Sequence, residues 1–132
     1  MMFQQSLSQK QIAAVLNLAG PERYDHFIKR VVDAQCTWGL WNEGWAMGVD
    51  ATGRATFPLW PASEYASLCA LGMWIDYEPT EIPLGGLINE LLPKLLSDGV
   101  QPSVFRTPEG DAVLPAIPQL LADLENEMSR YE

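Results

Sequence analysis

Two short loops that end in glycine constrain the fold of this chain more than any other feature. Asn42-Glu43-Gly44 and Ala51-Thr52-Gly53 both place glycine where a three-residue hairpin loop needs a left-handed residue. The flanking segments read as strands, from Thr37 to Trp41, Trp45 to Asp50 and Arg54 to Trp60. The chain is therefore expected to form a three-stranded antiparallel meander.

The loop geometry also sets the register and divides the side chains between two faces. Trp41 is expected opposite Trp45 and Asp50 opposite Arg54, and directly paired residues share a face. The predicted core face carries Trp41, Trp45, Met47, Val49, Ala55, Phe57 and Leu59. The other face mixes aromatic, small and polar residues: Trp38, Leu40, Ala46, Gly48, Arg54, Thr56, Pro58 and Trp60. Trp38 is expected across from Gly48, which leaves either room for a closely packed helix or a shallow aromatic groove.

Two helices are predicted before the meander. Ser8 and Gln11 form a capping box that starts the first helix, which is expected to run to about Leu18. Gly20-Pro21 breaks this helix and starts the second, because proline suits the first helical position. The second helix is expected to end near Gln35.

After the meander, the pattern predicts a helix from about Ser63 to Met73 and then a loop from Trp74 to Glu81. A stripe of leucine and isoleucine at helical spacing follows from Leu84 to Leu96. Pro93 interrupts this helix, so a kink or a restart is expected there.

A second hairpin is predicted near the C-terminus, with strands at 103–106 and 112–114 around the turn Thr107-Pro108-Glu109-Gly110. A final helix carries the inner stripe Ile117, Leu120, Leu121, Leu124 and Met128. The element order is ααβββααββα. It predicts one α+β domain over residues 1–132, whose antiparallel sheet of meander and hairpin packs against about five helices.

Charge and cysteine usage limit the partners and the compartment. The formal net charge of −9 repels nucleic acid and anionic lipid, and permits a basic protein partner. The longest apolar run, Ala66 to Ile75, is about half of the ~20 residues that a membrane-spanning helix needs. Met1 to Ser6 lacks the pattern of a signal peptide, and Cys36 and Cys69 read as free buried thiols. We therefore expect a cytoplasmic protein.

A resemblance to a known family lies in Trp45, in Phe57-Pro58-Leu59-Trp60-Pro61-Ala62-Ser63-Glu64-Tyr65-Ala66 and in Trp74-Ile75-Asp76-Tyr77-Glu78-Pro79. With Leu92-Pro93-Lys94-Leu95 and the segment from Asp98-Gly99 to Val104-Phe105, these blocks resemble the bacterial family catalogued as domain of unknown function 2750. The likeness covers about Tyr24 to Leu124. It implies a small stand-alone bacterial domain and brings no activity, cofactor or catalytic residue. Pro83 departs from the pattern, because a Ser or a similar cap is expected there.

No residue set in the sequence predicts catalysis, a metal or a cofactor. His26 is the only histidine and is expected to be exposed, without partners. Cys36 precedes a strand, where nothing lowers its pKa. The carboxylates Asp76, Glu78 and Glu81 are explained by solvation of their loop.

The tryptophans outside the predicted core face are the candidates for function. Trp38, Trp60 and Trp74 would form a recognition surface if they converge with Tyr65 and Arg54, since Trp, Tyr and Arg dominate binding hot spots. Asp76 and Glu78 would add an acidic border. The leading hypothesis is a non-enzymatic module that engages a protein partner through this surface.

Two alternatives remain open at the level of sequence. A small-molecule binder or cryptic enzyme would hold a pocket between the mixed sheet face and the loop from Trp74 to Glu81. A homodimer would use the mixed face for its own assembly.

Overall fold

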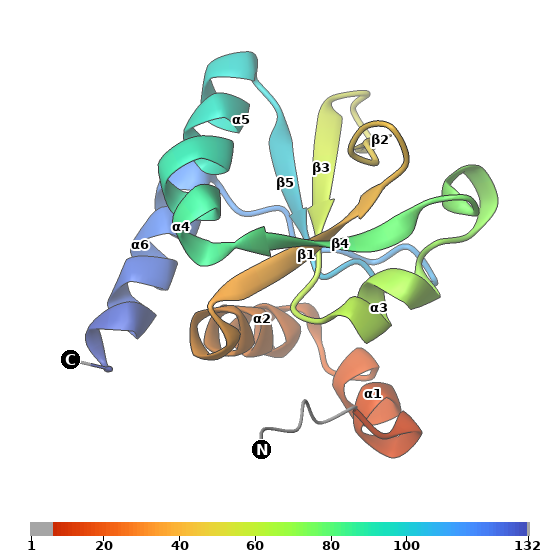
Figure 1. Ribbon diagram of the computed structural model, residues 1–132, viewed down its shortest axis with the longest axis horizontal. Coiled ribbons are helices and arrows are strands. Elements are labelled where there is room, and N and C mark those ends of the chain that lie inside the picture. The colour runs from red at the N-terminus through yellow and green to blue at the C-terminus, as the bar shows by residue number, and fades with distance from the viewer. Residues whose placement is uncertain (1–6, 132) are drawn as a thin grey trace.

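The structure is a computed structural model that describes residues 7–131, and it has the α+β class that the sequence predicts. A ribbon of two strands crosses a second sheet of three strands near the centre of the molecule, and helices pack around this crossing (Figure 1). The segment Met1 to Ser6 and the last residue of the predicted domain lie outside the described residues. Within 7–131, no helix is both long and apolar enough to cross a bilayer.

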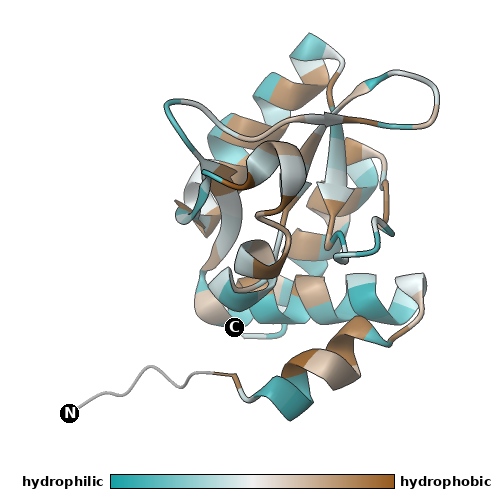
Figure 2. Cartoon of the chain, turned by 90° about the vertical axis from the view of Figure 1, so that its right-hand side faces the viewer, coloured by the Kyte–Doolittle hydropathy of each residue, from teal (hydrophilic) through white to brown (hydrophobic). Residues whose placement is uncertain are grey.

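The two N-terminal helices form where the sequence predicts them. Helix α1 (Gln9–Leu16) starts with the capping box, in which the Gln11 amide donates to Ser8 Oγ at 3.1 Å and the Ser8 amide donates to Gln11 Oε1 at 2.9 Å. Helix α2 (Gly20–Ala34) has proline in its first turn and buries the face that includes Phe27 and Val31. Helix α1 lies beneath α2 as an outlying element with no fully buried residue (Figure 2).

Both predicted hairpin registers are confirmed, but the strands of the predicted meander are divided between two sheets: β1 (Cys36–Trp41) lies in one, and β2 (Gly48–Val49) and β3 (Ala55–Leu59) lie in the other. Trp41 pairs with Trp45, and the Asp50 amide donates to the carbonyl of Arg54 at 2.9 Å. The glycine-ended loops therefore specify these turns locally.

The expected pairing of Trp38 with Gly48 is wrong. After the hydrogen bond from the Ala46 amide to the Leu40 carbonyl, the chain turns away from β1. Trp38 instead exchanges backbone hydrogen bonds of 2.9 and 2.8 Å with Trp60, just beyond β3. The strand β3 therefore starts beside β2 and ends beside β1, which produces the crossing of the two sheets (Figure 1).

The crossing also makes the predicted core face wrong in part, because no single face runs through the meander. Phe57 and Leu59 are buried, but Trp41 is 43% exposed, and Met47 and Val49 also face solvent. Buried residues of the opposite face include Leu40, Ala46, Thr56 and Trp60.

A strand replaces the second half of the loop predicted from Trp74 to Glu81. Helix α3 (Ser63–Leu68) ends earlier than expected and is followed by the short 3-10 helix η1 (Gly72–Trp74). The strand β4 (Glu78–Pro83) then pairs antiparallel with the whole of β1. Its two prolines hide the strand in the sequence, yet proline is tolerated at the edge of a sheet because the outer N–H groups have no ladder partner.

Pro93 widens its helix rather than splitting it. Helix α4 (Leu84–Gly86), the π-helical turn η2 (Leu87–Leu91) and helix α5 (Leu92–Asp98) form one continuous helical segment. Proline has no N–H for the carbonyl four residues earlier and its ring crowds that carbonyl. The preceding turn accommodates this by a wider pattern, in which the Leu92 amide donates to the carbonyl of Leu87.

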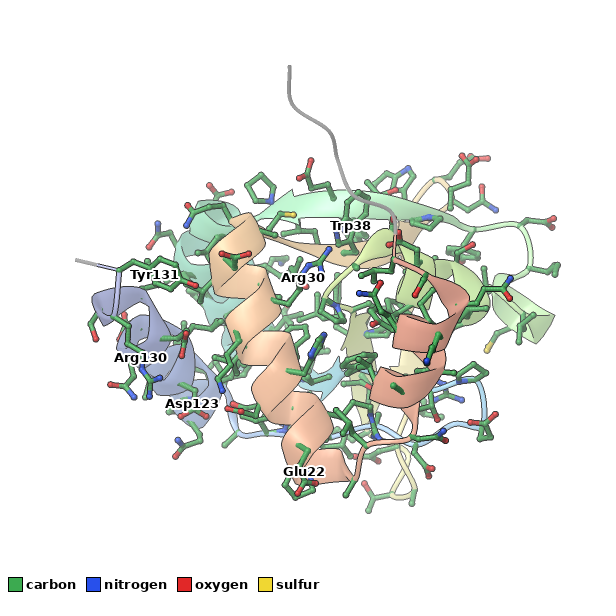
Figure 3. The ribbon with its side chains drawn as sticks, turned by 90° about the horizontal axis from the view of Figure 1, so that it is seen from below. Glu22, Arg30, Trp38, Asp123, Arg130 and Tyr131 are labelled. Atoms are coloured by element: carbon green, nitrogen blue, oxygen red, sulfur yellow. The ribbon has the colours of Figure 1, made fainter. Side chains whose placement is uncertain are left out.

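The strand β5 (Gln101–Val104) joins distant parts of the chain. It pairs parallel with β3, an arrangement that the sequence pattern does not predict. The predicted hairpin forms beyond it, since Val104 exchanges backbone hydrogen bonds of 2.7 and 2.9 Å with Val113. Helix α6 (Ile117–Ser129) closes the core, and its Asp123 accepts a hydrogen bond of 2.5 Å from Tyr24 of α2 (Figure 3).

Candidate functional site

Trp60 and Trp74 meet inside the molecule, where their ring centroids lie 6.3 Å apart in an edge-to-face arrangement. Both are buried, and so is Tyr65 of α3. Trp38 is half-buried and meets Trp60 through the backbone. Trp60 and Tyr65 therefore belong to the core, and only the surroundings of Trp74 open to a surface.

The three charged candidates are exposed, and none is hydrogen-bonded to this pair within residues 7–131. Arg54 is exposed, and its guanidinium donates to the Gly99 carbonyl at 3.1 Å and to Gln101 Oε1 at 3.3 Å. Asp76 and Glu78 are also exposed, and Glu78 begins the strand that pairs with β1. Arg54, Asp76 and Glu78 therefore do not form a hydrogen-bonded cluster with Trp60 and Trp74, and Glu78 pairs with Trp41 instead.

An open cavity of about 630 Å³ lies over Trp74, between residues 47–49, 69–74 and 106–108. We call it the apolar groove. Its rim keeps large apolar side chains in contact with solvent: Met73 is 79% exposed, Val49 69%, Leu71 53% and Met47 39%. The Trp74 indole packs directly over Gly48, where an added Cβ would lie at an ordinary contact distance of 3.6 Å from the ring.

Arg106 provides the charge in the apolar groove. Its guanidinium carbon lies 5.5 Å from the centroid of the Trp74 ring, a cation–π arrangement. The Trp74 indole itself is held by donating its N–H to the Met47 carbonyl at 3.3 Å. Among residues 7–131, the Arg106 guanidinium has no carboxylate within ion-pair distance and makes no hydrogen bond.

The backbone holds Arg106 in place from inside the core. The carbonyl of Arg106 accepts hydrogen bonds from Trp60 Nε1 at 3.0 Å and from the Cys69 thiol at 3.2 Å. The preceding Phe105 is fully buried at a φ of 56°, the left-handed region that a bulky residue avoids. Its amide donates to Leu59 and its carbonyl accepts from Arg23, so tertiary contacts hold the strained conformation that orients the next residue.

The described part of the chain offers little acid, base or nucleophilic chemistry. Burial raises the pKa of Cys69, which lines the groove, to about 11, and burial with the Glu81 carboxylate does the same for Cys36. The prediction that His26 is exposed is wrong, because its side chain is half-buried. Its Nε2 is enclosed without a hydrogen-bond partner in the described residues, because α2 turns it toward Tyr65 and Phe105. No cluster of metal-ligating side chains occurs within the same range.

Sequence reasoning missed Arg106 and placed Met47 and Val49 in the core. The pocket predicted between the mixed sheet face and the 74–81 segment coincides with the apolar groove only in part, since Gly48 and Trp74 line the groove but Asp76 and Glu78 do not. The sequence signal for Arg106 is its place directly before the tight turn that starts at Thr107.

Comparison with known proteins gives one finding. A search of curated proteins and a search of solved structures found no match. The model of the family described as "Protein of unknown function (DUF2750)" matches residues 24–124, which include every element that lines the apolar groove. Because this match spans most of the chain, the protein belongs to the DUF2750 family.

Proposed function

We propose that this protein is a non-enzymatic module that binds a protein partner through the apolar groove. The observation that carries the proposal is the rim of Met47, Val49, Leu71 and Met73, four large apolar side chains left in solvent around Trp74. Contiguous exposed apolar surface of this kind is typical of interaction sites. Covering it with a partner removes apolar area from water, which is the main driving force of association.

The openness of the groove favours a macromolecule over a small ligand. Small-molecule pockets usually enclose most of the ligand surface. Here the rim side chains of Val49, Leu71 and Met73 are each more than half exposed, so a small ligand would keep much of its own surface in water. Met47 and Met73 are unbranched and adaptable, which suits them to varied apolar side chains of a partner.

Trp74 and Arg106 supply fixed anchors within this adaptable rim. Both residue types are enriched in binding hot spots. The hydrogen bond to the Met47 carbonyl sets the Trp74 side chain before binding, and the bonds from Trp60 and Cys69 set the backbone of Arg106. Less conformational entropy is therefore lost when a partner docks.

The proposal also covers the absence of catalysis, the cellular location and the charge of the partner. Thiols with raised pKa values and an enclosed histidine support a role without catalysis. Two free cysteines support a reducing, cytoplasmic location, and the family resemblance supports a bacterial source. The net charge of −9 favours a partner of basic overall charge, because complementary fields speed association.

Panning a random peptide library against the immobilised protein tests the proposal without knowledge of the partner. We expect enrichment of peptides that share an apolar anchor side chain. Binding of these peptides should be lost with Met73→Asp, which places a charge on the rim. Leu96→Asp is the matched control, because Leu96 is an exposed apolar residue of α5 outside the groove.

Two outcomes would overturn the proposal. The first is a set of peptides that binds wild type, Met73→Asp and Leu96→Asp equally well. The second is a stable dimer of the wild type in light scattering that Met73→Asp converts to a monomer, since the groove would then belong to a second copy of the chain.

A further inference from the structure

A polar hollow adjoins the apolar groove and shares two of its residues, Val49 and Arg106. It has a volume of about 200 Å³ and lies over β3 and β5, between the 49–51 turn and the 110–114 segment. Thr56 and Ser103 line it from the sheet. The groove and the hollow therefore form one continuous surface, apolar at one end and polar at the other, with Arg106 between them.

Two hydroxyls of largely buried residues open into the hollow. Thr56 is 6% exposed and Ser103 is 4% exposed, but within residues 7–131 only His26 Nε2 is both fully enclosed and without a hydrogen-bond partner, so the Thr56 and Ser103 oxygens remain accessible from the hollow. The Thr56 hydroxyl points toward Gly48, because a Cβ there would lie 3.0 Å from Oγ1. Each hydroxyl can donate one hydrogen bond to a group that enters the hollow. Beside the Arg106 guanidinium, which forms no ion pair within residues 7–131, these donors provide a site for an oxyanion.

The charges around the hollow leave Arg106 as its cation in need of a partner. Asp50 also lines the hollow, but its Oδ1 accepts hydrogen bonds from the Thr52 amide, the Thr52 hydroxyl and the Arg54 amide within its own turn. These bonds lower the pKa of Asp50 and engage its carboxylate within the turn, so it forms no ion pair with Arg106, although its negative charge opposes part of the attraction of Arg106 for an anion. Arg54 turns away to Gly99 and Gln101, so it does not compete for a ligand in the hollow.

We infer that the hollow receives a carboxylate of the partner segment whose apolar side chain occupies the groove. The inference rests on the proposed function and adds the chemistry of the ligand. Arg106 would pair with the carboxylate through its planar fork of N–H groups, and the Ser103 and Thr56 hydroxyls would donate to the remaining oxygen lone pairs. The carboxylate comes either from an acidic side chain or from the C-terminus of the partner.

Small carboxylates test the hollow directly. Hexanoate and hexanamide have the same chain length and differ only in the charge of the head group. We expect hexanoate to bind about tenfold more tightly, because hydrogen bonds to a charged group are stronger than those to a neutral one. Titrations followed by NMR should shift both the Trp74 indole N–H and the Ser103 amide. Equal affinities for the two probes would overturn the inference, and so would inorganic phosphate that binds as tightly as hexanoate.

Single-residue variants show which side chains cause the preference for hexanoate over hexanamide. Arg106→Gln keeps a polar side chain and should remove the preference for hexanoate, whereas Arg54→Gln is the matched arginine control and should keep it. Ser103→Ala should weaken hexanoate several-fold, which provides a second test if Arg106→Gln folds poorly. An unchanged preference in both Arg106→Gln and Ser103→Ala would place the carboxylate elsewhere.

Two further experiments distinguish the two sources of the carboxylate and test the groove and hollow proposals separately. Acetyl-Leu-Leu with a free C-terminus and acetyl-Leu-Asp-Leu-amide present the carboxylate from the chain end and from a side chain, and the tighter one identifies the source. Loss of peptide binding in Met73→Asp concerns the apolar groove. If peptides bind through the rim while hexanoate and hexanamide remain equal, the proposed function stands and the carboxylate inference fails.

Discussion

The indole N–H of Trp60 donates a hydrogen bond of 3.0 Å to the backbone carbonyl of Arg106. Trp60 is fully buried, while the side chain of Arg106 reaches the surface over Trp74. A core tryptophan thus positions a residue of the candidate site. This relationship fixes the backbone from which the Arg106 side chain reaches over Trp74.

Trp60→Phe is expected to destabilise the protein by about 2–4 kcal/mol. The change removes the donor to a buried carbonyl and leaves a cavity where the larger indole was, and these two losses add. The free energy of unfolding in urea, followed by circular dichroism, measures the effect without relying on tryptophan fluorescence.

Trp41→Phe is the control for this prediction. Trp41 packs edge to face on Trp45 with 4.9 Å between ring centroids, but it stays partly in solvent. We expect a loss of about 1 kcal/mol or less. Equal losses at the two positions would show that Trp60 is not a specific support of the Arg106 backbone.

The helix C-termini provide a second prediction. Gln35 ends α2 at a φ of 63°, and Gly99 ends α5 at a φ of 72°. Gln35→Gly should stabilise the protein by about 0.5–1 kcal/mol, because glycine adopts the left-handed conformation without strain. Gly99→Ala should destabilise it by about 1 kcal/mol for the same reason. Changes of the same sign in urea unfolding would contradict this account.

Local signals predicted much of the fold. The capping box at Ser8 and the two glycine-ended loops act between residues close in sequence, and the structure has the helix start and both hairpin registers that they imply. The final helix follows from its leucine spacing in the same way. Each of these elements is determined by residues that lie within a few positions of one another in the sequence.

Contacts between distant segments were not predictable in this way. The pairing of β1 with β4 joins Cys36 to Pro83, and that of β3 with β5 joins Thr56 to Gln101. The alternation of apolar and polar residues in these segments does not indicate which strand each one pairs with. The faces of the meander depend on this crossing, so Met47 and Val49 were assigned to the core although they are exposed.

The candidate site was harder still to predict, because it depends on a left-handed backbone conformation at a residue type that rarely adopts it. A left-handed residue is expected to be Gly or Asn, and here it is Phe105, held by Leu59 and Arg23. The orientation of Arg106 follows from that conformation. Only the environment of Trp74 connects the predicted tryptophan surface with the site that the structure contains.

His26 is expected to make stability depend on pH. Burial first, and then the positive charge of Arg30, lower the pKa of His26 in the folded protein, while Asp25 acts in the opposite direction. The unfolded chain therefore takes up a proton near pH 6.5 before the folded protein does. The free energy of unfolding should fall as pH drops through this value, by at most about 1.4 kcal/mol per pH unit, and level off below the folded pKa.

Urea unfolding of wild type and His26→Phe between pH 8 and pH 5 isolates this contribution. Phenylalanine keeps a ring against Tyr65 and Phe105 but does not titrate, and the carboxylates contribute equally to both proteins. The difference in free energy between the two should therefore change with pH. Parallel profiles would show that His26 is protonated equally well in the folded and unfolded states.

Both cysteines are expected to be nearly inert in the folded protein. With pKa values of about 11 for Cys36 and Cys69, only about one thiol in a thousand is ionised at pH 8. In the unfolded chain, a pKa near 8.5 leaves about a quarter ionised. Labelling by a disulfide reagent at pH 8 should therefore be at least about a hundredfold slower in the native protein than in urea, since the thiolate is the reactive form. The single variants Cys36→Ala and Cys69→Ala report each thiol separately. Fast native labelling of Cys69, which lines the apolar groove, would mean that the groove activates a nucleophile and that a binding role alone is insufficient.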